Sequence, residues 1–198
     1  PESFQDPTWQ GLAAKSIAAY KQGDFAAAFE SIKGVPDTIA DPSFFTYRAA
    51  LLLAVGRSDE ARRDVERALS LRPNDSAALA LQAVIAVAQN DKDKALDAGQ
   101  KAVAANPKSS SALIALSYAQ QANFNLEGAR ASLKQAVEAN PNDALAWARL
   151  AELHMSFADL DEALEAAQKA TTIDPNLSRT QTVLGFAYLT QVKTTESR

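Results

Sequence analysis

Four short segments of the sequence resemble one another: LSLRP (69–73), VAANP (103–107), VEANP (137–141) and TTIDP (171–175). Each segment ends in a proline, and each proline stands 34 residues after the previous one. An internal period of this length is typical of repeat proteins, in which every repeat is one supersecondary unit. The spacing therefore predicts an array of helical hairpins, which is an architecture suited to binding.

The composition favours helices and limits the chemistry of the chain. Apolar residues make up 47% of the 198 residues, and much of that share is alanine, which has the highest helix propensity. The net charge is −4 with both signs interspersed, so no basic stripe is present to neutralise phosphates, and we expect no nucleic-acid partner. No apolar run reaches the roughly 18 residues that a membrane span needs.

Neither the composition nor the ends of the chain identify a compartment. Cysteine is absent, which excludes disulfides and thiolate metal sites but does not separate the cytoplasm from the periplasm. The sequence begins at Pro1 rather than Met and carries no signal peptide, so we expect it to be a fragment of a larger protein.

Turn and capping residues divide the chain into units. Asp6-Pro7 and Asp41-Pro42 each place a helix-capping side chain before a proline at the first helical position. The predicted units are about 7–39, 40–73, 74–107, 108–141 and 142–175, and a final helix follows at 178–191. The predicted helices cover about 7–22, 25–33, 42–55, 58–71, 76–89, 92–105, 110–123, 126–139, 144–157, 160–173 and 178–191.

Two kinds of residue recur at fixed places in the second helix of each unit. The first kind is a capping residue before the helix: Asp24, Asp91, Asn125 and Asp159. In the last of these units Asp159 and Glu162 have the spacing of a capping box. The second kind is a small residue four positions later, which lets two helices approach closely: Ala28, Ala61, Ala95, Ala129 and Ala163.

These features together resemble the tetratricopeptide repeat family. The residues that match its pattern best are Trp147, Leu150, Ala151, Ala163, Ala170 and Pro175. The resemblance covers about residues 7–191. It implies an all-α fold, a right-handed superhelical solenoid of antiparallel helix hairpins with about five hairpins and one C-terminal helix. Gly99 departs from the pattern, since the family usually has a large residue there, and we expect it to loosen its helix.

A second resemblance is to a narrower group. The segments WARLAEL (147–153) and TQTVLGFAYL (180–189) are similar to those of long bacterial tetratricopeptide proteins that carry a FecR-like envelope domain upstream.

The sequence offers almost nothing for catalysis. His154 is the single histidine, and a lone histidine beside Leu150, Leu153 and Phe157 is more often a packing residue than a ligand. All seven glycines are isolated, so no phosphate-binding loop is present. We therefore expect no enzyme activity, no cofactor and no metal. An unrecognised enzyme would require two carboxylates that converge in a closed cleft.

The resemblance implies a binding surface along the first helices, which line a concave groove in this family. The corresponding residues are largely apolar with polar edges: Ile17, Tyr20, Thr46, Leu53, Val84, Tyr118, Gln121, Arg149, Glu152, Met155, Arg179 and Phe186. We expect a protein or peptide partner to bind there, with Tyr118, Met155 and Phe186 as anchors. Some family members hold a C-terminal carboxylate with Lys and Asn side chains. Those places are mainly apolar here, which argues against that mode.

The alternative is a structural module that assembles with copies of itself. The last helix carries Val183, Leu184, Phe186 and Tyr188, which are more apolar groups than one neighbouring helix can cover. The sequence therefore also permits a homo-oligomer formed through the last helix.

Overall fold

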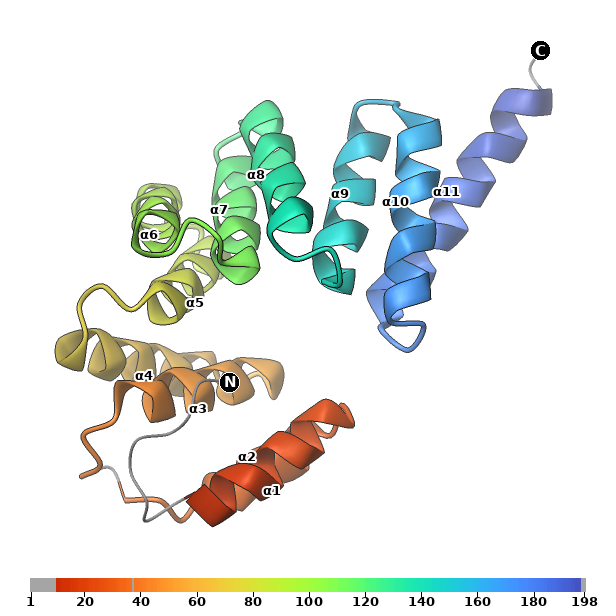
Figure 1. The fold of residues 1–198 in the computed structure, drawn as a ribbon. Coiled ribbons are helices and arrows are strands. Elements are labelled where there is room, and N and C mark those ends of the chain that lie inside the picture. Colours follow the sequence, from red (N-terminus) through yellow and green to blue (C-terminus); the bar gives the residue numbers. More distant parts are fainter. Residues whose placement is uncertain (1–9, 37, 197–198) are drawn as a thin grey trace.

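Helices make up all the regular structure in the part of the chain that the computed structural model describes, residues 10–36 and 38–196 (Figure 1). The helices are α1 (Gln10–Lys21), α2 (Phe25–Ile32), α3 (Pro42–Ala54), α4 (Ser58–Leu71), α5 (Ser76–Ala88), α6 (Lys92–Ala105), α7 (Ser110–Ala122), α8 (Leu126–Ala139), α9 (Ala144–Ser156), α10 (Leu160–Ile173) and α11 (Ser178–Glu196). The predicted right-handed solenoid of hairpins followed by one last helix is confirmed. The predicted helix start at Pro7 lies outside the described residues.

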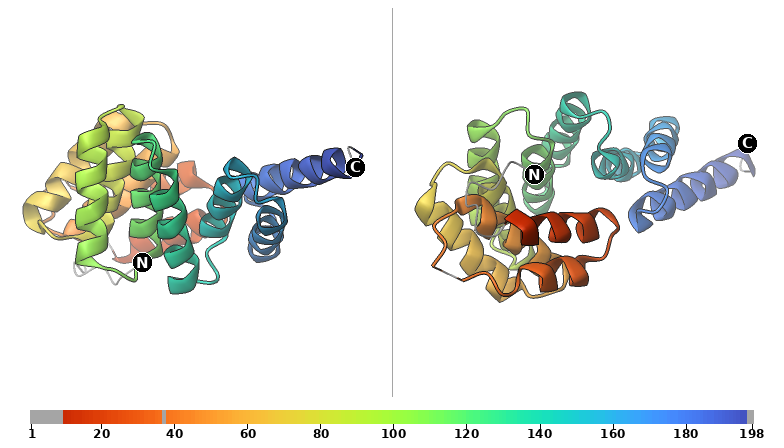
Figure 2. Two further views of the ribbon diagram at one scale, coloured as in Figure 1. Left: turned by 90° about the horizontal axis from the view of Figure 1, so that it is seen from above. Right: turned by 60° about the horizontal axis from the view of Figure 1, so that its bottom comes forward.

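The hairpins stack in chain order. Within a hairpin the two helices pack together, and each second helix also packs on the first helix of the next hairpin. Buried side chains form a succession of clusters along this stack rather than one central core. Figure 2 shows that α1 to α8 curl together, whereas α9 to α11 extend away from them. Each hairpin therefore depends on its immediate neighbours, as in other repeat proteins.

Three of the predicted caps of second helices form hydrogen bonds. The side chains of Asp24, Asp91 and Asn125 each accept a bond from the backbone N–H three residues later. Asp159 stands at the N-cap of α10 as predicted, but its side chain makes no capping bond, so the expected side-chain cap is not formed. Its Oδ2 instead lies 2.9 Å from Nη1 of Arg130 and 3.3 Å from Nδ1 of His154. The carboxylate is therefore directed to these two side chains and not to the backbone amides of α10.

The turn inside each hairpin contains one residue in the left-handed conformation. These residues occupy the same place in successive units: Gly23 (φ 77°), Gly56 (79°), Asn90 (58°), Phe124 (60°) and Ala158 (61°). Glycine adopts this conformation without steric cost and asparagine tolerates it, whereas phenylalanine and alanine are strained there. The turn geometry is thus kept even where the residue does not favour it.

Small buried residues set the spacing between helices. Ala61, Ala95, Ala129 and Ala163 are all fully buried. The expected loosening at Gly99 is not seen, since α6 runs unbroken through it and Gly99 is buried against α7. A β-carbon on Gly99 would lie 3.1 Å from Cα of Leu116, so the glycine allows α6 and α7 to approach closely. His154 is 7% exposed, which agrees with its predicted packing role.

Helix α11 is longer than the sequence indicated, since it continues five residues beyond the predicted end at residue 191. No glycine or proline follows Gly185, so no residue in the sequence stops the helix there.

Candidate functional site

The twelve residues predicted to bind a partner all lie on first helices, from α1 to α11, and we call them the first-helix surface. Tyr20 and Phe186 are exposed, at 44% and 56%. Arg149 is buried, at 3%. The others are partly exposed: Ile17, Thr46, Leu53, Val84, Tyr118, Gln121, Glu152, Met155 and Arg179. Most of the predicted surface is therefore accessible to another molecule, and neither Tyr118 nor Phe186 is lost to the core.

Five of these residues form a single polar network across α7, α9 and α11: Tyr118, Gln121, Arg149, Glu152 and Arg179. We call it the arginine–glutamate network. Arg179 donates from Nε to Oε1 of Glu152 (2.7 Å) and from Nη1 to the hydroxyl of Tyr118 (3.1 Å). Arg149 donates to the same carboxylate and, through Nη2, to Oε1 of Gln121 (2.6 Å). One glutamate thus holds two arginines.

The guanidinium of Arg149 is stacked as well as hydrogen-bonded. Its Cζ lies 4.1 Å from the centre of the Tyr118 ring, a favourable cation–π arrangement. Its Nε is buried and has no hydrogen-bond partner among the described residues. Helices α7 and α9 make few direct contacts, so these side chains connect two first helices whose hairpins otherwise pack through α8.

Arg179 is the more accessible arginine of the network, and its side chain is 39% exposed. Burial acts to lower the pKa of Arg179. The hydrogen bonds to Glu152 and Tyr118 and the nearby charge of Glu152 outweigh that effect and raise its pKa above the ordinary value. Arg179 therefore stays charged, and the two arginines with one glutamate leave a net positive charge on this part of the surface.

At the other end of the stack, Tyr20 belongs to an aromatic group. Its ring centre lies 5.3 Å from that of Phe25 and 6.3 Å from that of Tyr47. The Tyr47 hydroxyl is 2.9 Å from Oγ of Ser16, and burial raises the Tyr47 pKa. Phe25 was missed because it lies on α2, a second helix, and Ser16 and Tyr47 were missed because each stands one position away from a predicted residue. Tyr20 and the arginine–glutamate network lie on helices at opposite ends of the stack.

Within the described residues, no group of three or more histidine, aspartate or glutamate side chains is arranged to hold a metal ion. None of the helices in the described part of the chain combines the length and the apolar character that a membrane crossing requires.

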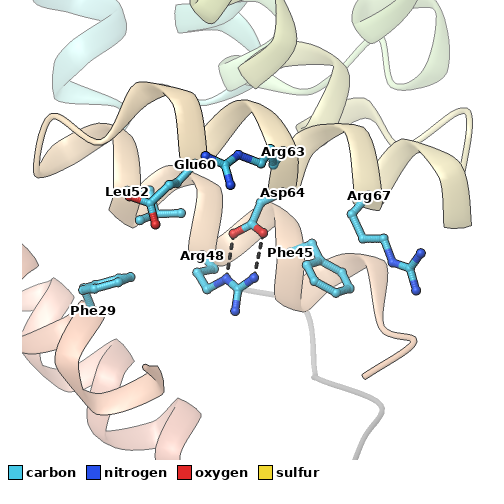
Figure 3. A pocket seen from close by; sticks show the side chains of 8 residues that line it. All are labelled: Phe29, Phe45, Arg48, Leu52, Glu60, Arg63, Asp64 and Arg67. Atoms are coloured by element: carbon cyan, nitrogen blue, oxygen red, sulfur yellow. Dashed lines mark hydrogen bonds and ion pairs between the residues drawn. The ribbon is translucent and has the colours of Figure 1, made fainter. Parts of the chain in front are cut away.

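A cavity of about 420 Å³ lies off the first-helix surface, between α2 and the α3–α4 hairpin (Figure 3). Three of its lining residues are arginines: Arg48, Arg63 and Arg67. Sequence reasoning missed it, although six of the ten arginines of the chain fall within residues 48–72. This local concentration of arginines could have indicated the cavity, but only the net negative charge of the whole chain was considered.

Comparison with protein families identifies the repeats. Family models described as tetratricopeptide repeat match residues 48–110 and 120–185, about two-thirds of the chain. None of the curated proteins compared with this chain matches it significantly.

Comparison with solved structures agrees. A thermophilic TPR protein from Thermus thermophilus superposes with a TM-score of 0.78 at 22% identity, covering 91% of this chain and 98% of the other. The APC/C hetero-tetramer Cut9–Hcn1 superposes with a TM-score of 0.71 at 16% identity, covering 90% of this chain and 36% of the other. MamA from Desulfovibrio magneticus superposes with a TM-score of 0.58 at 20% identity, covering 87% of this chain and 98% of the other. At these identities the likeness shows the fold alone.

Proposed function

The chain belongs to the tetratricopeptide repeat family, and we propose that its first-helix surface is a groove that binds an extended or helical segment of a partner protein. A role as a protein-interaction scaffold is what this fold supports in general. The observation that favours the first-helix surface is its exposed apolar content. Val84 and Met155 pack against buried clusters but keep part of their surface open to solvent, and Phe186 is 56% exposed. Apolar groups gathered on a surface are typical of interaction sites.

The chemistry of the surface suggests how a partner is held. Met155 and Phe186 provide apolar anchors, and methionine adapts its shape to different ligands. Glu152 and Arg179 are accessible enough to form hydrogen bonds with a bound backbone or side chain, and they would fix its register. Arg149 is too deeply buried to contact a ligand, so its role is to hold Glu152 in place.

The test is a selection from a displayed peptide library, followed by affinity measurement of the selected peptides. We expect the double variant Met155→Ala/Phe186→Ala to weaken their binding by about tenfold or more, since buried anchors carry most of the energy of an interface. Phe124→Ala is the matched control, because Phe124 is 83% exposed and lies in a hairpin turn off the first-helix surface. Equal binding by both variants would exclude the proposed groove.

A second candidate function is self-association through α11. Three residues share one place in successive first helices: Ser117, Ala151 and Gly185. Ser117 and Ala151 are fully buried, whereas Gly185 is exposed and a β-carbon on it would meet no atom within 4 Å. Tyr188, on the same face, is 48% exposed. This face of α11 is therefore available to a second copy of the chain.

A further inference from the structure

The cavity between α2 and the α3–α4 hairpin is separate from the first-helix surface. Phe29 of α2 faces Phe45 and Leu52 of α3 across it, while Arg63 and Arg67 of α4 line its rim (Figure 3). Residues 45, 48 and 52 are spaced by three and four, so they share one face of α3. Residues 46 and 53, which belong to the first-helix surface, lie on a different face. A ligand in this cavity would not compete with one on the first-helix surface.

Both carboxylates in the cavity are already held by arginines. Arg48 donates from Nε and Nη2 to the two oxygens of Asp64, at 2.7 Å each, and Asp64 is 5% exposed. Glu60 accepts from Nε of Arg57 at 2.7 Å, and this hydrogen bond lowers the Glu60 pKa, so that carboxylate stays charged. Asp64 is consequently occupied by Arg48, whereas the charge of Glu60 also acts on Arg63.

Arg63 and Arg67 have no ion-pair partner among the residues that the structure describes. They stand four residues apart on α4, and like charges at this spacing destabilise a helix. The guanidinium of Arg67 lies 5.9 Å from the centre of the Phe45 ring, at the edge of the cavity. The cavity therefore presents two arginines without an ion-pair partner in the described residues, although the charge of Arg63 also acts on Glu60. The rings of Phe29 and Phe45 beside them are nearly buried, at 8% and 2% exposed.

Two later hairpins carry an ion pair at the places that Arg63 and Arg67 occupy in the second unit. The residues at the place of Arg67 in the third and fifth units are Lys101 and Lys169. Each forms an ion pair of 2.6 Å with the acid at the place of Arg63, which is Asp97 or Glu165. The second unit has arginine at both places and so lacks this stabilising pair. The arrangement is specific to this hairpin rather than a property of the repeat.

We propose that this cavity binds an acidic peptide segment of a partner protein. Two carboxylates of the segment pair with Arg63 and Arg67, and an apolar side chain next to them covers the part of Phe29 that is still exposed. Side chains two residues apart on an extended peptide face the same way about 7 Å apart, close to the spacing of neighbouring turns of α4. A volume of about 420 Å³ is within the range of ligand sites.

Carboxylates suit the cavity better than phosphates. Asp64 and Glu60 also line it, and their negative charges would repel a ligand that carries two charges on one group. Single carboxylates, one on each arginine, bring less negative charge near these acids than a doubly charged phosphate would. A peptide is therefore favoured over a nucleic acid as the occupant.

The experiment uses a fluorescein-labelled peptide with the core Glu-Ser-Glu-Ser-Phe, and its binding to the whole chain is followed by fluorescence anisotropy. We expect Arg63→Gln/Arg67→Gln to weaken binding by about tenfold or more, because two charge-assisted contacts are lost. The matched control is Arg62→Gln/Arg72→Gln, which removes the same charge around the same helix outside the cavity. We expect the control to bind within about twofold of wild type.

Circular dichroism establishes that all variants are folded, and Phe186→Ala serves as a second control that should leave binding unchanged. Four results would overturn the proposal. They are an equal loss in the two double variants, equal binding of a Gln-Ser-Gln-Ser-Phe peptide, no saturable binding of the acidic peptide, and tighter binding of a single-stranded oligonucleotide of the same charge.

Discussion

At the scale of single residues, Glu152 is the residue on which the arginine–glutamate network depends. It is the one acid among the five residues and accepts hydrogen bonds from both Arg149 and Arg179. The Arg149 side chain is only 4% exposed, so its charge has little access to water if Glu152 is neutralised. Removing one partner of a buried ion pair is costly, whereas replacing the buried cation by an apolar side chain often is not.

We therefore expect Glu152→Gln to lower the free energy of unfolding by about 3 kcal/mol and Arg149→Met by about 1 kcal/mol or less. In Arg149→Met, Glu152 keeps its bonds to Arg179, so no charge is stranded. Urea unfolding followed by circular dichroism measures both values. Equal losses in the two variants would mean that the buried charge is stabilised by something other than Glu152.

Two glycines provide a contrast that separates helix propensity from packing. Gly185 has open space where a β-carbon would be, whereas a β-carbon on Gly99 would lie 3.1 Å from Cα of Leu116. In dilute solution we expect Gly185→Ala to stabilise the protein by about 0.5–1 kcal/mol, since alanine favours the helix. We expect Gly99→Ala to destabilise it by about 1 kcal/mol, because the clash with a neighbouring backbone exceeds the gain in propensity. Thermal unfolding of the two variants tests the opposite signs.

At this scale the sequence predicted features that depend on one residue and its local backbone. It did not predict hydrogen bonds between residues that are far apart in the chain. Asp24, Asp91 and Asn125 cap their helices as predicted, because a cap depends only on local chain geometry. The side chain of Asp159 makes no capping bond and instead pairs with Arg130, which lies 29 positions earlier in the chain. The positions of Tyr118, Gln121, Glu152 and Arg179 on first helices were expected. Their hydrogen bonds were not, since bond partners depend on side-chain conformations.

At the scale of the helix and its turn, the repeat period was enough to predict the helices. Both helices of a hairpin are fixed by apolar spacing and by caps that recur every 34 residues, so each unit supports the interpretation of the others. The left-handed residue in each turn could not be predicted in every unit. Gly23 and Gly56 indicate it, but Phe124 and Ala158 occupy the same conformation without any sequence signal.

This difference yields a prediction for the turns. Ala158 has φ 61°, and a left-handed alanine is strained by roughly 1–2 kcal/mol relative to a right-handed one. We expect Ala158→Gly to stabilise the protein by about 0.5–1 kcal/mol, because part of the relieved strain is offset by the greater flexibility of unfolded glycine. Gly56→Ala is the matched reversal in the second hairpin and should destabilise by a similar amount. If both substitutions shifted the unfolding midpoint in the same direction, turn strain would not be the cause.

At the scale of the whole molecule, the stack has a surface that its own helices do not cover. Each earlier hairpin buries the shared place of Ser117 and Ala151 under its second helix, and among the described residues no helix does so for Gly185. Gln181, Gly185 and Tyr188 recur with helical spacing on this face of α11. A second chain that places its own α11 there would restore the packing of a hairpin, and a two-fold arrangement would satisfy both copies.

We expect sedimentation velocity over a range of concentrations to show a reversible dimer, because the face is small and association through it is weak. The double variant Gly185→Glu/Tyr188→Glu should shift the equilibrium to monomer, since four negative charges would then meet across the two-fold axis. It leaves each monomer intact because neither side chain enters the core. Phe124→Glu is the control, as it places a charge on another exposed aromatic residue away from α11. A wild-type protein that stays monomeric at every concentration would exclude assembly through α11 and leave binding of other proteins as the use of this scaffold.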